Sequence, residues 1–152
     1  MNYKCIAVIV LSLALSGNTL ASQRQRQVRQ NSMQVMPFSM DATMHMFQPN
    51  ADGGVMTVMV RKPNAKQLTL IRSHLRREAR AFAGGNYGDP ASIHGNAMPG
   101  LAKLHSGWRL VAVRYADIPG GATITFKSSR APVVSRFTNG SQRKSWITAP
   151  MQ

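Results

Sequence analysis

Residues 64–83 read NAKQLTLIRSHLRREARAFA, and this stretch decides the fold. Its apolar residues recur every three or four positions and share a narrow arc of a helix. They are Leu68, Ile71, Leu75, Ala79 and Phe82. Asn64 is a good helix N-cap, and Gly84-Gly85 ends the pattern. The sequence therefore predicts one amphipathic helix over 65–83, whose apolar stripe packs on a sheet.

Two β-hairpins are predicted, one on each side of this helix. Their strands are expected at 44–47 and 55–61, and at 108–115 and 122–127, where β-formers or alternating residues flank turn-rich segments. The fold class is therefore α+β, a four-stranded antiparallel sheet from two hairpins with one long helix packed on one face.

The segment 86–107 between the helix and the second hairpin is rich in turn residues. Pro90 and Pro99 are each placed to open a short helix. Asp89 is interpreted as a capping residue of the first of these turns.

The first 21 residues are typical of a secretory signal peptide. A short basic start precedes an apolar run over 5–16, and small residues precede Ala21, after which we expect cleavage. The run is too short to span a bilayer comfortably, although an uncleaved anchor is the alternative. Cleavage removes Cys5, the only cysteine, so the mature chain has no disulfide and no catalytic thiol. We expect a bacterial periplasmic or secreted protein, not transmembrane after cleavage.

Basic residues far outnumber acidic residues in the chain, and the part after residue 21 divides into three segments. The sequence has 19 Lys and Arg against 5 Asp and Glu, a formal charge of +14. Residues 22–40 are interpreted as a flexible Gln/Arg/Met arm, 41–127 as the α+β domain, and 128–152 as a basic, disordered tail. Since an exported protein rarely meets nucleic acid, an anionic envelope surface is the macromolecular partner that the basic ends indicate. The alternative is that these ends are solvated tails that keep the protein soluble.

Methionine and histidine are the residues that indicate a metal. The chain has ten methionines and four histidines. Thioether and imidazole groups together suit copper where thiols oxidise. In the triplet 44–46, Met44 and Met46 share one face of a strand and His45 takes the other. The alternative is that these methionines fill the core.

A second set of candidate ligands comes from the long helix and the loop after it. His74 lies at the edge of the apolar stripe, with Glu78 one turn on to orient its imidazole as a second-shell carboxylate. His94 and Met98 lie four residues apart in a segment bounded by glycine and proline. We expect His74, His94 and Met98 to converge, with His45 as a fourth ligand.

Catalysis is less expected than binding. The chain contains no Gly-x-Ser-x-Gly, His-Glu-x-x-His or P-loop motif. The leading hypothesis is a soft-metal binding protein, for copper, that buffers or delivers the ion. A basic envelope-associated protein without metal is the alternative.

The order of motifs from about Asp41 to Phe126 resembles a family of small exported bacterial proteins. The matching segments are Met44-His45-Met46-Phe47, Asp52-Gly53-Gly54-Val55, residues 71–76, Asn86-Tyr87-Gly88-Asp89-Pro90, Ile93-His94-Gly95, Met98-Pro99-Gly100-Leu101 and residues 115–120. The resemblance implies the fold outline and makes His45, His74, His94 and Met98 motif positions. Members are often labelled aspartate carbamoyltransferase, which adds carbamoyl transfer as a third hypothesis, although the chain has no Ser-Thr-Arg-Thr phosphate loop.

The chain departs from this family after Lys127. Family members look as though they continue into an amphipathic helix that ends near Asp-His-Gly, whereas this chain ends in a basic tail. Back-translated in a neighbouring frame, residues 137–148 can spell a similar ending, so we interpret the tail as a frameshift product. The coding DNA tests this hypothesis.

Overall fold

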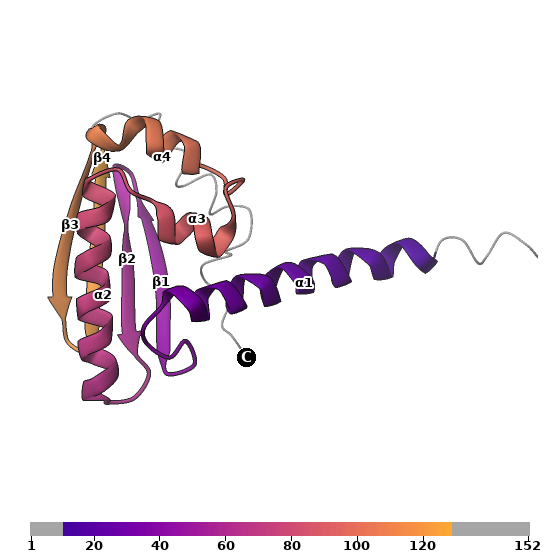
Figure 1. Ribbon diagram of the computed structural model, residues 1–152, viewed down its shortest axis with the longest axis horizontal. Helices are drawn as coiled ribbons and strands as arrows, with labels where there is room; N and C mark the ends of the chain where they lie inside the picture. Colours follow the sequence, from indigo (N-terminus) through magenta and orange to yellow (C-terminus); the bar gives the residue numbers. More distant parts are fainter. Residues whose placement is uncertain (1–10, 129–152) are drawn as a thin grey trace, which may run out of the picture.

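A computed structural model describes residues 11–128, and its fold is α+β (Figure 1). The elements in chain order are α1 (Leu11–Val35), β1 (Thr43–Asn50), β2 (Gly53–Val60), α2 (Ala65–Ala83), α3 (Gly88–His94), α4 (Leu101–Gly107), the 3-10 helix η1 (Trp108–Leu110), β3 (Val111–Ile118) and β4 (Gly121–Ser128). The predicted four-stranded antiparallel sheet with a long helix on one face is confirmed.

Helix α2 has the predicted bounds, because local signals fix both of its ends. The Asn64 side chain accepts a hydrogen bond from the Gln67 backbone N–H at 3.0 Å, as an N-cap does. The apolar stripe is buried on the sheet, with Ile71 and Leu75 almost wholly inaccessible to solvent. Burial of this stripe is the main contribution that holds α2 in place.

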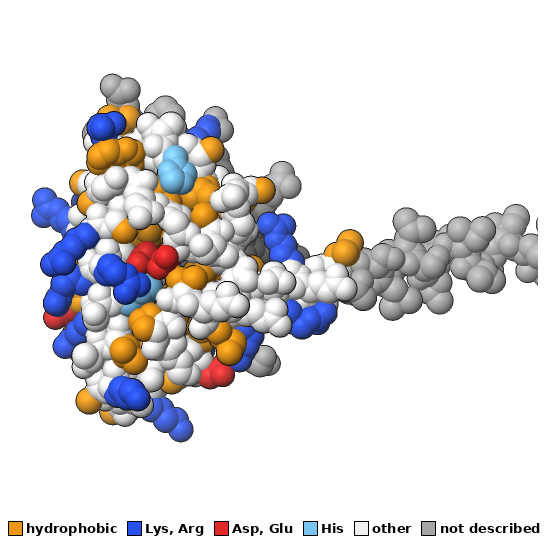
Figure 2. Space-filling model, viewed as in Figure 1, with side chains coloured by type: hydrophobic (Ala, Val, Ile, Leu, Met, Phe, Trp, Pro, Cys, Tyr) orange, Lys and Arg blue, Asp and Glu red, His pale blue; other side chains and the backbone are white. Residues whose placement is uncertain are grey.

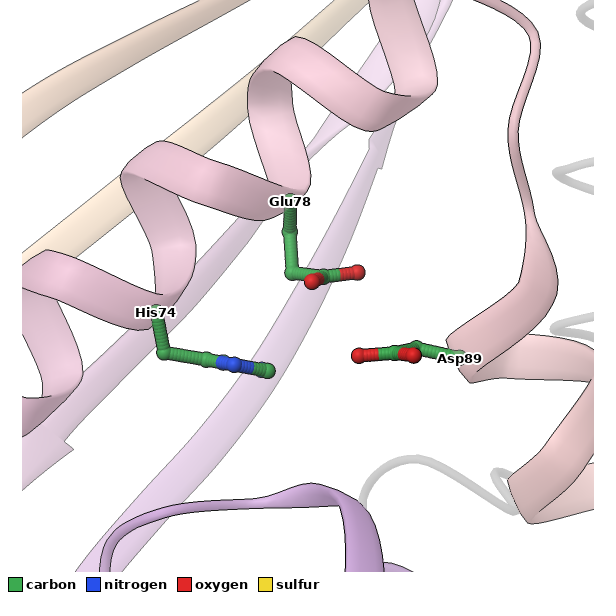
Figure 3. Close-up of side chains that lie close together, drawn as sticks. All are labelled: His74, Glu78 and Asp89. Atoms are coloured by element: carbon green, nitrogen blue, oxygen red, sulfur yellow. The ribbon is translucent and has the colours of Figure 1, made fainter.

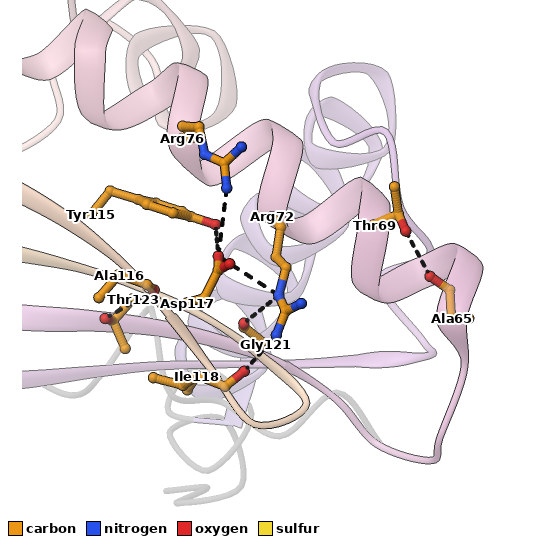
Figure 4. A network of polar contacts seen from close by, with 10 residues as sticks. All are labelled: Ala65, Thr69, Arg72, Arg76, Tyr115, Ala116, Asp117, Ile118, Gly121 and Thr123. Carbon is orange, nitrogen blue, oxygen red and sulfur yellow. Dashed lines mark hydrogen bonds and ion pairs between the residues drawn. The ribbon is translucent and has the colours of Figure 1, made fainter.

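A polar network fixes α2 to the turn between β3 and β4 (Figure 4). The Arg72 guanidinium donates to the carbonyl oxygens of Ile118 at 3.0 Å and Gly121 at 3.3 Å. Its Nε lies 3.7 Å from the carboxylate of Asp117, which also accepts a hydrogen bond from the Tyr115 hydroxyl. The Arg72 side chain of α2 therefore donates hydrogen bonds to two carbonyl oxygens at this turn.

The sheet has the order β1-β2-β4-β3, so the two hairpins meet through β2 and β4. Strands β1, β2 and β4 are longer than predicted. Strand β3 has the predicted length but begins at Val111 rather than at Trp108, because residues 108–110 form η1. Alternation sends Val58, Ile124 and Phe126 to the face that α2 covers, where they join the core.

Helix α1 corrects the expectation of a flexible arm over 22–40. Residues 22–35 continue a helix that begins at Leu11 and crosses Ala21 without a break. The segment contains no glycine or proline, and its Gln, Arg and Met residues are good helix formers. Figure 1 shows α1 projecting from the domain, with its C-terminal end against α3. There the Asn31 side chain donates to the Ile93 carbonyl at 3.2 Å, and Ser32 is buried.

The residues after α1 also belong to the domain. Phe38 is 4% exposed, and Met36 and Met40 pack against the core. The Ser39 backbone N–H donates to Oε1 of Gln67 at 2.7 Å, which ties this loop to α2. The domain therefore begins before residue 41, contrary to the prediction.

Among the described residues, no helix combines the length and the hydrophobicity that crossing a membrane requires. The basic start of the predicted signal peptide and the predicted tail after Ser128 lie outside the described residues.

Candidate metal centre

Three side chains of the kind that ligate metal ions point toward one another between α2 and α3 (Figure 3). They are His74 and Glu78 of α2 and Asp89 of α3, and one ligand atom of each lies within 4.8 Å of the others. Of the described residues, this is the group of three His, Cys, Asp or Glu side chains whose geometry suits a metal ion.

Each of these side chains is placed by local structure. His74 and Glu78 are four residues apart, so they share one flank of α2. After Gly84 the chain turns back sharply, because the Asn86 backbone N–H bonds to the Ala81 carbonyl at 2.9 Å. This turn brings the first turn of α3, with Asp89, beside that flank.

Tyr87 fixes the turn between the two helices. Its ring stacks on Phe82, with the centroids 5.4 Å apart, and it is 2% exposed. The predicted capping role of Asp89 is wrong, because the N-cap position of α3 is Tyr87 and Asp89 lies within the first turn of the helix, beside α2.

Arg77 places a positive charge at the same point. Its guanidinium donates to Nδ1 of His74 at 2.7 Å, and it lies 3.5 Å from the carboxylate of Glu78 and 3.8 Å from that of Asp89. The hydrogen bond to His74, which the sequence predicted from Glu78, is therefore made by Arg77. Because the Arg77 side chain is 61% exposed, it has room to leave.

The surroundings of Glu78 disfavour the ionised form of its carboxyl group. Burial raises the pKa of Glu78 to about 7, with further contributions from the charge of Asp89 and a hydrogen bond to it, against the opposing effect of Arg77. A carboxyl group with such a pKa is part-protonated near neutral pH. A bound cation would replace this proton.

The two histidines near the loop at Phe38 are held neutral. Burial, followed by the charge of Arg77, lowers the pKa of His74 to about 4. Burial, followed by the charge of Arg61, lowers the pKa of His45 to about 4. The Phe38 ring lies 5.6 Å from each imidazole, measured between centroids. A neutral imidazole is the form that binds a metal ion.

The set offers one nitrogen and two oxygen atoms, with one side toward solvent, since the Asp89 side chain is 38% exposed. Such mixed donors suit borderline divalent ions such as Zn²⁺ and Cu²⁺. Glu78, predicted to act only through His74, offers its own carboxylate here.

This group is a different set from the predicted convergence of His74 with His94 and Met98, which stays a prediction. Burial and the charge of Arg24 in α1 lower the pKa of His94, whereas the charged groups that act on His74 are Arg77, Asp89 and His45. Met98 packs against the core. The helix α1, which the sequence did not predict, takes the place beside His94.

His45, Met44 and Met46 lie outside the group as well. The His45 ring contacts Phe38, and its Nε2 lies 3.3 Å from Oγ1 of Thr43. Met44 and Met46 alternate with His45 along β1, so they lie on the face of the sheet opposite α2.

Asp89 and Arg77 are absent from the site residues that the sequence predicted. Both follow from signals in the sequence, because Arg77 lies one turn from His74 and Asp89 lies in the first turn after the helix reverses. Only the folded geometry shows that the two approach the same point. Comparison of the chain with family models, curated proteins and solved structures gives no match.

Proposed function

We propose that the protein binds a divalent transition-metal ion through His74, Glu78 and Asp89. The observation that supports this is the approach of three different ligand side chains to within 4.8 Å, two of them buried. Burying a carboxyl group and an imidazole costs free energy, and a shared ion would offset that cost.

Cu²⁺ is the ion we expect to bind most tightly, followed by Zn²⁺. Affinity for a nitrogen and oxygen site rises along the first-row divalent metals and peaks at copper. Copper therefore stays the proposed ion, with imidazole and carboxylates as its ligands in place of thioethers. Because one side of the site faces solvent, the ion can enter and leave, as buffering or delivery requires.

Arg77 has to move for the ion to enter. Its guanidinium and a metal ion would occupy the same region, and two positive charges repel at that distance. Arg77 therefore lowers the affinity of the free site and returns to the carboxylates when the ion leaves.

Calorimetric titration with Cu²⁺ and Zn²⁺ tests the proposal. The full chain would carry Cys5→Ser, since a thiol binds both metals. We expect Asp89→Asn to weaken binding more than tenfold while keeping the side-chain shape, and His74→Ala to do the same. Asp52→Asn, an exposed carboxylate in the β1–β2 turn that pairs with Lys127, is the matched control. Equal affinities of the wild type and Asp89→Asn would overturn the proposal.

A second candidate is binding to an anionic surface without metal. Figure 2 shows basic side chains to be far more frequent than acidic ones on the face that carries α2. Lys66, Arg76 and Arg80 are exposed on this helix. Adhesion to anionic vesicles that weakens with salt, and that Lys66→Glu with Arg80→Glu abolishes, would support it.

Export to the periplasm or the medium, and membership of the family whose motifs the chain resembles, are further proposals that rest on the sequence. Carbamoyl transfer rests on that resemblance alone.

A further inference from the structure

The methionines of residues 36–98 divide into two sets. Met36, Met40, Met56 and Met98 are partly buried against the hydrophobic core. Met44, Met46 and Met59 are not part of that core, although each lies in a strand of the sheet. Packing in the core therefore explains the methionines of the first set and does not explain those of the second.

Strand alternation gathers the second set on the face of the sheet opposite α2. His45 faces α2, because its ring contacts Phe38, and its partner Val58 is 1% exposed. Met44, Met46 and Met59 are the strand neighbours of these two residues, so they point the other way.

The register brings the three side chains together. Met44 lies directly opposite Met59, and Met46 follows two residues along the same strand. The Cβ atoms of opposed residues are about 5 Å apart in an antiparallel pair, and diagonal neighbours are within reach of long side chains. A methionine has three rotatable bonds, so the three sulfur atoms can converge on one ion.

The next strand, β4, lies beside the Met59 side chain. The partner of Met59 in β4 is Gly121, which has no side chain on the open face. A Cβ atom at Gly121 would lie 3.0 Å from Cγ of Met59. The Met59 side chain therefore lies over β4, on the side of β2 away from β1, and it has to rotate about its side-chain bonds to bring its sulfur toward Met44 and Met46. Met44 is 37% exposed, so an ion in solution reaches the group.

We propose that Met44, Met46 and Met59 form a second metal site, for a soft monovalent cation such as Cu⁺. Thioether sulfur is a soft, uncharged ligand that selects Cu⁺ over the harder divalent ions. Strand positions ordinarily favour β-branched residues, and Thr57, Thr123 and Thr125 occupy half-buried positions on this face of the sheet. The site shares no residue with the group at His74, Glu78 and Asp89.

Ag⁺, a redox-stable substitute for Cu⁺, provides the direct test. Methionine methyl groups would be isotope-labelled in the full chain carrying Cys5→Ser and followed by NMR during titration with Ag⁺. We expect the methyl signals of Met44, Met46 and Met59 to shift together at one equivalent. The signals of Met36 and Met56, which pack against the core, should stay in place. Uniform shifts of all methionines, or shifts in the core set alone, would overturn the proposal.

A pair of variants in one strand provides the second test. Met59→Leu keeps the apolar volume and removes one sulfur, so we expect Cu⁺ affinity, measured by competition with a coloured Cu⁺ chelator, to fall at least tenfold. Met56→Leu, which faces the core, should leave the affinity unchanged. Asp89→Asn should also leave it unchanged, so failure at one site is distinguishable from failure at the other. Equal affinities of Met59→Leu and the wild type would contradict the site.

Discussion

The guanidinium of Arg77 donates a hydrogen bond to Nδ1 of His74 over 2.7 Å. The donor is positively charged and the acceptor is a neutral, largely buried imidazole, so this contact occupies the lone pair that a metal ion would use. The same guanidinium also lies beside the carboxylates of Glu78 and Asp89. Arg77 thus takes the position of a cation in the cluster, and the account of metal binding depends on its exchange with an ion.

Removing this internal cation should raise metal affinity. Arg77→Met keeps most of the side-chain length and removes the charge and the donors, so we expect Cu²⁺ and Zn²⁺ to bind about tenfold more tightly, equivalent to about 1.4 kcal/mol. Calorimetric titration measures the change. Arg80→Met, exposed on the same helix, is the control and should bind as the wild type does. Weaker binding in Arg77→Met would mean that Arg77 organises the site instead of competing for it.

Metal affinity should rise with pH because of Glu78. The pKa of Glu78 is raised to about 7, chiefly by burial, so below that pH an ion has to displace a proton from the carboxyl group. The apparent affinity should therefore increase as the pH approaches 7 and level off above it. Glu78→Gln should bind more weakly and lose most of this dependence. A wild-type affinity that is flat across pH 7 would contradict the assignment of Glu78 as a ligand.

His45 should make the fold sensitive to acid. Its pKa in the folded protein is lowered to about 4, mainly by burial, from an ordinary value of 6.5. Its contribution to stability is thus fully present above pH 6.5 and is lost as the pH falls from 6.5 toward 4, because the unfolded chain takes up the proton first. Across that window, His45→Leu should gain roughly 2 kcal/mol of unfolding free energy relative to the wild type.

Urea denaturation of the two proteins at both ends of the window measures this gain. Glu78 acts in the opposite direction, since its raised pKa favours the folded state at low pH and this contribution is lost as the pH rises through about 7. Because both proteins keep Glu78, the comparison isolates His45. Parallel pH profiles of the two proteins would show that His45 is not held neutral by the fold.

The junction between the hairpins should tolerate no side chain at Gly121. A Cβ atom there would lie 2.0 Å from the carbonyl oxygen of Val58 in β2. We expect Gly121→Ala to lower the unfolding free energy by about 3 kcal/mol, as strain in a packed backbone does. Thr123→Ala, two residues along β4 on the same face, should cost less than about 1 kcal/mol. Equal costs, measured by thermal denaturation, would place the strands farther apart than described.

Local signals made part of the fold predictable. The cap at Asn64 and the apolar period along α2 depend on residues close in sequence, so both ends of α2 follow from them. The pairing of β2 with β4 joins residues far apart in the chain, and periodicity alone does not specify that order.

In the candidate site, too, only the features that depend on residues close in sequence could be predicted. The spacing of His74 and Glu78 placed both on one flank of α2, as the structure has them. Further ligands are predicted from His94 and Met98, because they lie four residues apart in a segment bounded by glycine and proline. Once residues 22–35 continue α1 and pack on α3, His94 lies near Arg24, and Asp89 is the α3 residue that reaches α2.

Electron paramagnetic resonance of the full chain, carrying Cys5→Ser, with one equivalent of Cu²⁺ tests the site at His74, Glu78 and Asp89. We expect coupling to a single imidazole nitrogen in an otherwise oxygen-ligated site, and loss of that coupling in His74→Ala. A spectrum with two or more coordinated imidazoles, or one that His74→Ala leaves unchanged, would contradict it.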